Sequence, residues 1–221
     1  MKIEWLGLSS YKLTESTGLS IVMDPYKSEK SGLDFPKTTA DAVTISHRQY
    51  DSSAVLNGSK GKLVIETPGF HELDGVKLSG FLSYRDSNKG KERGRNIVYK
   101  VRMDGVEICH LGDIGEELSP MLAELIGMTN ILFIPIGTGN TLDPQTAKEY
   151  VDMLMPDIVI PMQSTQRGWH RSDIGSMMDE FIDMFDESDV EHVGGNTVEF
   201  DRADFDGEKT RVLIFKHRAH S

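Results

Sequence analysis

Short alternations of hydrophobic and polar positions fill the first half of the chain and predict β-strands. The segments KIEWLG, SSYKLT and LSIVMD are separated by Ser, Thr and Gly, which are typical of turns, and this indicates an antiparallel meander. Brief apolar runs at 40–46 and 61–67 suit buried strands. Further strands are expected in GVKLSGFLSY, NIVYKVRMDG and VEICHLGD. Asp104 and Gly105 predict a hairpin turn between the last two, because glycine accepts positive φ.

The second half of the chain alternates between helical and strand patterns. Ser119 and Pro120 are a suitable N-cap and first residue for a helix that runs to about residue 126, and Asp143 and Pro144 repeat this signal for a helix that ends before residue 156. Apolar positions at helical spacing predict a third, amphipathic helix; they are Ile174, Met177, Met178, Phe181, Ile182 and Phe185.

Buried strands are expected between these helices, at 130–137 and 157–162, and closing strands at 198–200 and 211–216. A region of strands followed by strand–helix alternation favours two packed sheets with helices outside, a fold of the α/β (α+β) class. No internal repeat or low-complexity linker divides the sequence, so we expect one domain over residues 1–221.

The amino-acid composition excludes several classes of protein for this chain. The 221 residues are 38% hydrophobic and 27% charged, which is ordinary for a globular protein. The net charge of −11 argues against nucleic acid or an anionic membrane as partner. No apolar run approaches the roughly 20 residues of a membrane span. The single cysteine, Cys109, excludes an internal disulfide and a cysteine zinc site; with no signal peptide in the first residues, we expect a cytoplasmic protein.

Polar residues concentrate at the ends of predicted strands, at 47–52, 84–96, 110–113 and 161–166. Strand ends are where side chains from distant segments meet in a pocket. In their order and spacing these segments resemble the metallo-β-lactamase superfamily, in its branch of small metal-dependent hydrolases similar to ascorbate-6-phosphate lactonases. The matching motifs are MKIEWLG, GLSIVMDPY, ADAVTISHRQYDS, SYRDSNKGKERGRNIVYKVRMDG, HLGDIG and DIVIPMQS. The resemblance implies a four-layer αββα sandwich of two mixed sheets.

The resemblance also implies a dinuclear zinc site, and this chain departs from its ligand set. His47, Asp51 and Asp113 stand at ligand positions and are kept. The other positions carry Gln49, Ser52, Arg85 and Gln163 in place of histidine, so four of the seven ligand positions are changed. Gln and Ser offer neutral oxygens, whereas zinc at such sites prefers imidazole or thiolate.

Arg85 changes the electrostatics most. A guanidinium at a ligand position would repel a divalent ion, and a planar fork of N–H donors suits two carboxylates. We therefore expect Arg85, with help from Arg48, to bridge Asp51 and Asp113 where the relatives hold metal. The alternative is that Arg85 is a surface residue of its loop.

The leading hypothesis is a non-catalytic or diverged binding or regulatory protein with no expected cofactor, and a pocket of His47, Gln49, Asp51, Ser52, Arg85, Asp113 and Gln163. The alternative is a hydrolase of lactones or phosphoesters that uses one divalent ion, Mg²⁺, Mn²⁺ or Zn²⁺, at Asp51, Asp113 and Gln163, with His47 as a catalytic group. Enzymatic activity is thus undecided from the sequence. The partner could be a small molecule, another protein or a second copy in a homo-oligomer.

Other candidates have less specific patterns. The basic run at 85–95 suits a solvated loop, or a phosphate or carboxylate site through Lys89, Lys91, Arg93 and Arg95. GTGN at 137–140 lacks the dinucleotide-binding pattern and predicts a turn. His71, His110 and His170 are possible replacement ligands, although His110 on a predicted strand favours a packed, hydrogen-bonded role. Cys109 suits the core.

Overall fold

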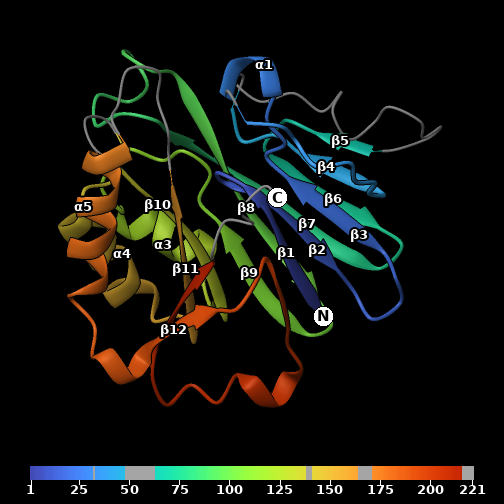
Figure 1. The fold of residues 1–221 in the computed structure, drawn as a ribbon. Coiled ribbons are helices and arrows are strands. Elements are labelled where there is room, and N and C mark those ends of the chain that lie inside the picture. The colour runs from blue at the N-terminus through green and yellow to red at the C-terminus, as the bar shows by residue number, and fades with distance from the viewer. Residues whose placement is uncertain (32, 48–62, 138–140, 164–170, 216–221) are drawn as a thin grey trace.

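The computed structural model of the chain describes residues 1–221 except 32, 48–62, 138–140, 164–170 and 216–221. Its strands form two mixed sheets (Figure 1). The six-stranded sheet has the order β13 (Thr197–Glu199), β1 (Lys2–Gly7), β2 (Ser10–Thr14), β3 (Ser20–Met23), β4 (Ala42–Thr44) and β5 (Leu63–Ile65). The eight-stranded sheet has the order β12 (Val190–Val193), β14 (Arg211–Phe215), β11 (Ile158–Gln163), β10 (Ile131–Ile136), β9 (Val106–His110), β8 (Arg95–Met103), β7 (Val76–Tyr84) and β6 (Gly69–Leu73).

Local sequence patterns account for most of these strands. β1, β2 and β3 form the expected antiparallel meander. The β8–β9 hairpin turns at Asp104 and Gly105, whose φ values are 51° and 77°, so both residues adopt the left-handed conformation that such a turn requires. β6 and β12 were not predicted. Both are edge strands with polar positions, GFHEL and VEHV, and pairing with a neighbour rather than a hydrophobic pattern defines them.

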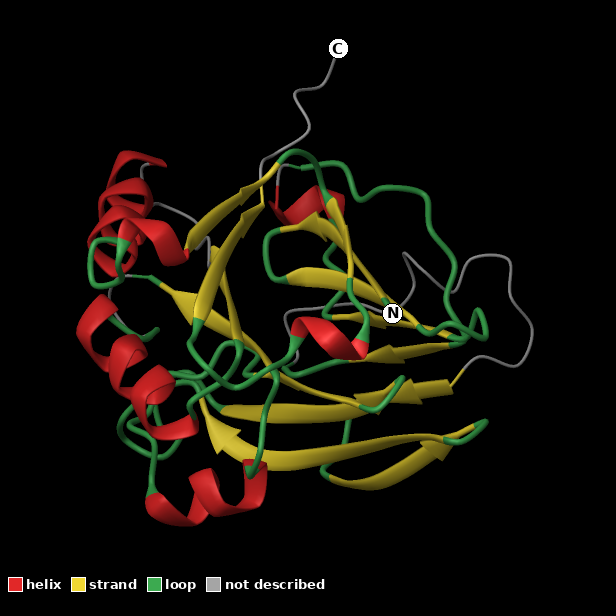
Figure 2. Cartoon of the chain, turned by 90° about the horizontal axis from the view of Figure 1, so that it is seen from below, coloured by secondary structure: helices red, strands yellow, loops and turns green. Residues whose placement is uncertain are grey.

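Helices lie mostly to one side of the strands (Figure 2). They are α1 (Ser28–Ser31), α3 (Pro120–Ile126), α4 (Pro144–Leu154) and α5 (Arg171–Ile182), with 3₁₀ turns at Glu187–Asp189 and Arg202–Asp204. Both predicted caps are confirmed: Ser119 accepts from the Leu122 amide and Asp143 from the Thr146 amide. α5 begins three residues before the predicted helix and ends at Ile182. In the described part of the chain, no helix is long and apolar enough to cross a membrane.

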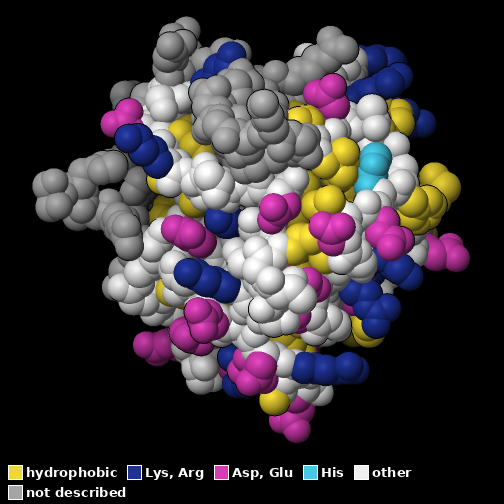
Figure 3. All heavy atoms as spheres, turned by 90° about the vertical axis from the view of Figure 1, so that its right-hand side faces the viewer, with side chains coloured by type: hydrophobic (Ala, Val, Ile, Leu, Met, Phe, Trp, Pro, Cys, Tyr) yellow, Lys and Arg dark blue, Asp and Glu magenta, His cyan; other side chains and the backbone are white. Residues whose placement is uncertain are grey.

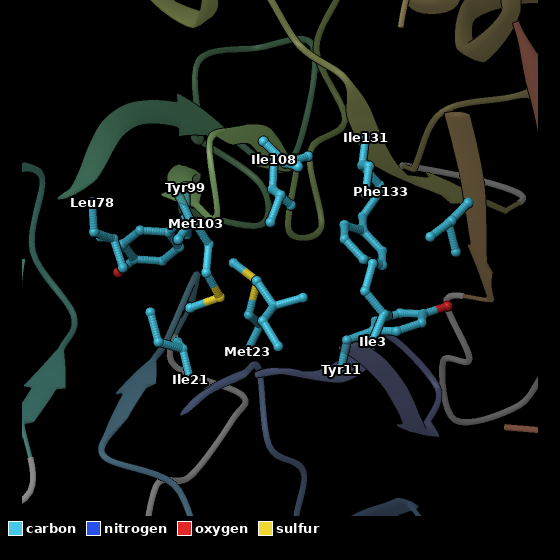
Figure 4. Close-up of a cluster of buried hydrophobic side chains, with 14 of the residues drawn as sticks. Ile3, Tyr11, Ile21, Met23, Leu78, Tyr99, Met103, Ile108, Ile131 and Phe133 are labelled. Carbon is cyan, nitrogen blue, oxygen red and sulfur yellow. The ribbon is translucent and has the colours of Figure 1, made fainter. Parts of the chain in front are cut away.

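The hydrophobic core has two main parts. One lies between the sheets, where Tyr11, Met23, Tyr99 and Phe133 come from both sheets and point toward one another (Figure 4). The other lies between the eight-stranded sheet and α3 to α5, and contains Leu132, Ile134 and residues of each of these helices. Alternate residues of β10 therefore enter opposite clusters, which is the pattern of a strand buried on both faces.

Strand direction determines where the polar segments meet. β9, β10 and β11 are parallel, and β7 runs in the same direction because β8 is antiparallel to both of its neighbours. The carboxyl ends of β7, β9 and β11 therefore reach one edge of the eight-stranded sheet. Tyr99 Oη donates to the carbonyl oxygens of Ile45 and Ile65, which brings the end of β4 from the other sheet to the same edge.

Candidate functional site

Arg85 and Asp113 meet at this edge as a buried ion pair. Arg85 directly follows β7, and Asp113 lies in the turn after β9. The Nε and Nη2 atoms of Arg85 lie 2.9 and 2.6 Å from Asp113 Oδ2, and both residues are buried. The arginine thus contacts one of the two carboxylates that the sequence assigned to it.

A second arginine, Arg93, donates to the same carboxylate oxygen. Its Nη2 lies 2.9 Å from Asp113 Oδ2, and its Nη1 donates to the Arg85 carbonyl oxygen at 3.0 Å. The prediction of a solvated basic loop is therefore wrong for Arg93, although Lys89, Lys91 and Arg95 are exposed. Burial lowers the pKa of Arg93 and Asp113 acts in the opposite direction; a guanidinium stays charged at neutral pH.

Asp86 shapes the loop that delivers Arg93. Its carboxylate accepts from four backbone amides of the loop, those of Asn88, Gly90, Glu92 and Arg93. Burial would raise the pKa of Asp86, but these donors together hold it below its ordinary value. The pairing of β7 with β8 sets Tyr84 opposite Arg95, and the Arg85 amide donates to the Gly94 carbonyl. The hairpin therefore places Arg85 and Arg93 side by side.

A buried asparagine holds the backbone of Asp113 through a hydrogen bond. The Asp113 amide donates to Oδ1 of the fully buried Asn96, whose Nδ2 donates to Ser83 Oγ and to the Leu111 carbonyl. The preceding Gly112 has φ 66°, and a Cβ there would lie 2.4 Å from Asn96 Oδ1. Only glycine fits this turn, because a side chain would displace the residue that holds Asp113.

A second group of buried polar residues lies beside the first. Asp24, in a left-handed turn after β3, accepts from the Ser46 amide at 2.7 Å and from Ser46 Oγ at 2.5 Å. The same hydroxyl lies 2.9 Å from His47 Nδ1, and His47 Nε2 lies 3.9 Å from Asp113 Oδ2. Burial raises the pKa of Asp24 to about 7, while the side-chain and backbone hydrogen bonds from Ser46 lower it.

His110 completes this second group in a neutral form. Gly112 donates its amide to His110 Nδ1 at 3.1 Å, so the ring proton lies on Nε2, which is 3.0 Å from the Ser9 carbonyl oxygen. Burial lowers the pKa of His110 to about 4. His110 Nδ1 is 4.0 Å from Asp24 Oδ2. Because this nitrogen accepts the Gly112 amide, it carries no proton to donate to the carboxylate. The packed, hydrogen-bonded role predicted for His110 agrees with these contacts.

Most of the remaining predicted site residues fall in parts of the chain that the structure does not describe. Gln49, Asp51, Ser52 and Arg48 fall outside the described residues, as do His170 and residues 138–140 of the GTGN segment. Gln163 ends β11, and its side chain is not described. The other two candidates are unrelated to this edge: Cys109 is buried, and His71 lies on the edge strand β6.

The chemistry of the described groups is that of hydrogen-bond donors around a carboxylate. Among residues with described side chains, no cluster of three or more His, Cys, Asp or Glu could hold a metal ion. Asp113 stands at a position where the resemblance implies a metal ligand, and its Oδ2 receives two guanidinium groups. This donor set does not fit a divalent cation, which needs acceptor atoms on every side.

Arg93 was named from the sequence only as part of a basic run that suits a phosphate or carboxylate, and its contact with Asp113 was not predicted, although a signal for it exists. Pairing the two predicted strands around the basic loop would have set Arg85 and Arg93 on neighbouring positions of one hairpin. The Ser46–Asp24 contact has no comparable local signal, because it joins residues from different strands.

Comparisons with known proteins agree with the fold. Residues 2–163 match a family model described as the β-lactamase superfamily domain. A UPF0173 metal-dependent hydrolase of Thermococcus onnurineus is 28% identical over an alignment of 190 residues, and the match covers 73% of this chain and 84% of the relative. A crystal structure from Thermotoga maritima, named as a Zn-dependent hydrolase of the metallo-β-lactamase superfamily, has a TM-score of 0.77 and 32% identity and covers 97% of this chain and 99% of its own.

A more distant structure shows the fold alone. A diiron β-hydroxylase from Streptomyces venezuelae has a TM-score of 0.60 at 13% identity and covers 98% of this chain but 52% of its own. Hydrolase and hydroxylase names thus occur on one architecture, so the reaction has to be argued from the residues of the site.

Proposed function

The chain belongs to the metallo-β-lactamase superfamily, in a branch whose relatives are named metal-dependent hydrolases, and from this premise we propose that it is a diverged member that binds a ligand without metal-dependent hydrolysis. In this proposal an internal pair of cations takes the place of the metal centre. The protein then acts as a binding or regulatory module that keeps the architecture of the hydrolases.

One observation carries the proposal: Arg85 and Arg93 both donate to Asp113 Oδ2, at 2.6 and 2.9 Å. At an effective dielectric of about 20, a divalent ion about 4 Å from one guanidinium is repelled by roughly 8 kcal/mol. This repulsion is most of the apparent ~10–16 kcal/mol with which structural zinc binds, so the ion and Arg85 are close to mutually exclusive.

The substituted ligand positions support the same conclusion. Gln49, Ser52 and Gln163 present an amide or a hydroxyl where imidazole is expected. Family chemistry uses zinc to lower the pKa of a bound water from about 15.7 to about 7. His47 acting alone as a general base would provide only about 10²–10⁴-fold. The family reaction therefore does not transfer to these residues.

The test is the metal content of the full-length protein, produced in medium supplemented with zinc and manganese and purified without chelator. We expect far less than one equivalent of transition metal per chain by mass spectrometry, and no rise in Tm on zinc addition. A bound ion at about 100 times its Kd would add about 2.7 kcal/mol of stability. Near-stoichiometric metal, or hydrolysis of lactones or phosphodiesters that depends on Mn²⁺, would overturn the proposal and favour an enzyme with one hard ion at Asp51 and Asp113.

A matched control restores histidine at Gln49, Ser52, Arg85 and Gln163 in one variant. If the substitutions are the cause of metal exclusion, this variant gains zinc under the same conditions while the natural chain does not.

A further inference from the structure

The outer face of the eight-stranded sheet is unevenly covered by helices. α4 packs on β10, and α5 packs on β10 and β11, whereas α3 contacts β7. In the described part of the chain, the principal helix contacts are with β7, β10 and β11, and none of comparable extent is made with β6 or β8. This leaves the outer face of the β6–β8 strands as an open wall beside a short helix.

That wall and α3 enclose a groove with a cavity volume of 630 Å³. Its lining includes Phe70, Lys77, Phe81, Met121, Glu124 and Leu125. Phe70 is 87% exposed, Met121 71% and Leu125 52%. Viewed from the side on which β5 and β6 end the sheets, hydrophobic side chains emerge between charged ones (Figure 3). A groove that exposes large apolar side chains between charged ones is typical of a protein contact surface.

The charges in the groove differ from those of the whole chain. The chain carries a net charge of −11, yet the groove is lined by three bases, Lys77, Lys100 and Arg102, and two acids, Glu107 and Glu124. Acidic copies of one protein repel each other over most of their surface, so they can approach most closely at a patch without excess negative charge.

Two of these charges have no ion-pair partner in the described part of the chain. Lys100 donates to the carbonyl oxygens of Ile126, which ends α3, and of Met128. It also lies 3.5 Å from Glu107, which pairs with Arg102 at 3.5 Å. Lys77 and Glu124 remain exposed and lie on opposite walls of the groove, one on β7 and one on α3. They have opposite sign, so the groove is complementary in charge to a second copy of itself.

We propose that the groove between β6–β8 and α3 is the contact surface of a symmetric homodimer of this chain. A two-fold interface uses one patch on both copies, so the patch must carry both a projection and a hollow. Phe70 and Met121 project beside the hollow, and each enters the groove of the other copy. Lys77 of each copy pairs with Glu124 of the other. Standard interfaces use roughly 20–30 residues a side, so the contact includes the flanks of α3 and β6.

The experiment measures mass in solution by sedimentation velocity across a range of micromolar concentrations, on the full-length chain. We expect a dimer for the natural protein and at least a tenfold rise in the dimer Kd for Met121→Asp. The matched control is Met155→Asp: Met155 is 77% exposed, but it lines a separate cavity of 570 Å³ beyond α3. This control keeps the dimer. Both positions are exposed, and unchanged unfolding curves would verify that neither variant perturbs the fold.

A charge exchange identifies the partner as a second copy. Lys77→Glu should weaken the dimer, because it places like charges together at both ends of the contact. Adding Glu124→Lys should restore it, since the pair is re-formed with reversed sign. A monomeric natural chain at all concentrations, equal loss of the dimer in both methionine variants, or failure of the double variant to recover would overturn the proposal.

Discussion

Asp24 and Asp113 are buried carboxylates at the same edge of the molecule, with 1% and 5% of their surface exposed. Asp113 receives three N–H donors from two arginines on one oxygen. Asp24 receives an amide and a hydroxyl from Ser46 and faces a neutral His110. Burial raises the pKa of Asp24 to about 7, so near neutral pH this group is close to half protonated.

The comparison shows that burial alone does not decide the charge of a carboxylate. A buried carboxylate is stabilised either by a full opposite charge or by a proton, and hydrogen bonds from neutral groups are not enough to keep Asp24 ionised. At Asp113 the opposite charge comes from within the chain. In the region that resembles a metal site, Arg85 and Arg93 therefore balance the charge of Asp113. In the neighbouring region, protonation of Asp24 reduces the buried charge.

The largest expected difference between the two regions is in the cost of removing each carboxylate charge. Asp113→Asn leaves two buried guanidinium groups without their carboxylate and should lower the free energy of unfolding by about 3–5 kcal/mol. Asp24→Asn replaces a partly neutral group and should cost about 1 kcal/mol. Urea unfolding at pH 7 measures both. Equal costs for the two variants would contradict the assignment of the ion pair to Asp113 alone.

The next prediction concerns pH and separates Asp24 from His110. A carboxyl with a raised folded pKa stabilises the fold fully below its unfolded pKa of about 4, and this contribution is lost as pH rises to about 7. His110, with its folded pKa lowered to about 4, contributes fully above about 6.5 and loses its contribution as pH falls toward 4. Between about pH 4 and 6.5 the two contributions therefore oppose each other.

Substituting either residue should reveal the pH dependence of the unfolding free energy that the other residue contributes. Its slope is at most roughly 1.4 kcal/mol per pH unit. Relative to the natural chain, Asp24→Asn should become more stable as pH rises from 4.5 to 6.5, because only the His110 contribution remains. His110→Gln should become less stable over the same range. Unfolding midpoints in urea at several pH values give these slopes, whatever each variant costs in absolute stability. Parallel pH profiles for all three proteins would show that neither group titrates as described.

The smallest effect tests the hydroxyl that joins the second region to His47. Ser46→Ala removes an oxygen that contacts both Asp24 and His47 Nδ1, but the Ser46 amide still donates to Asp24. We expect a loss of about 1 kcal/mol in the free energy of unfolding and no change in the Arg85–Asp113 pair. The imidazole resonances of His47 in NMR spectra should shift, because its Nδ1 loses the contact with the hydroxyl. A loss as large as that of Asp113→Asn would mean that the two regions are not independent.

Part of the candidate site could be predicted from local sequence. Arg85 stood at a position where the resemblance requires a metal ligand, and its charge made Asp113 the expected partner. Arg93 could have been predicted from the hairpin register. The expected Arg48 and Asp51 contacts lie outside the described residues and stay predictions. Asp24 and Ser46 could not be paired from the sequence, because they follow different strands, β3 and β4, and their contact depends on how those strands align.

Local signals along the chain were sufficient to predict several elements: the alternating pattern of β1 to β3, the Asp104–Gly105 turn, and the Ser119 and Asp143 caps. These depend on interactions between residues a few positions apart. Which charges meet depends on the packed fold, because the parallel course of β7, β9 and β11 brings distant loops to one end of the sheet. The packed fold also decides the pKa of Asp24 and the opening beside α3, since burial and uncovered surface arise only when the whole chain has packed.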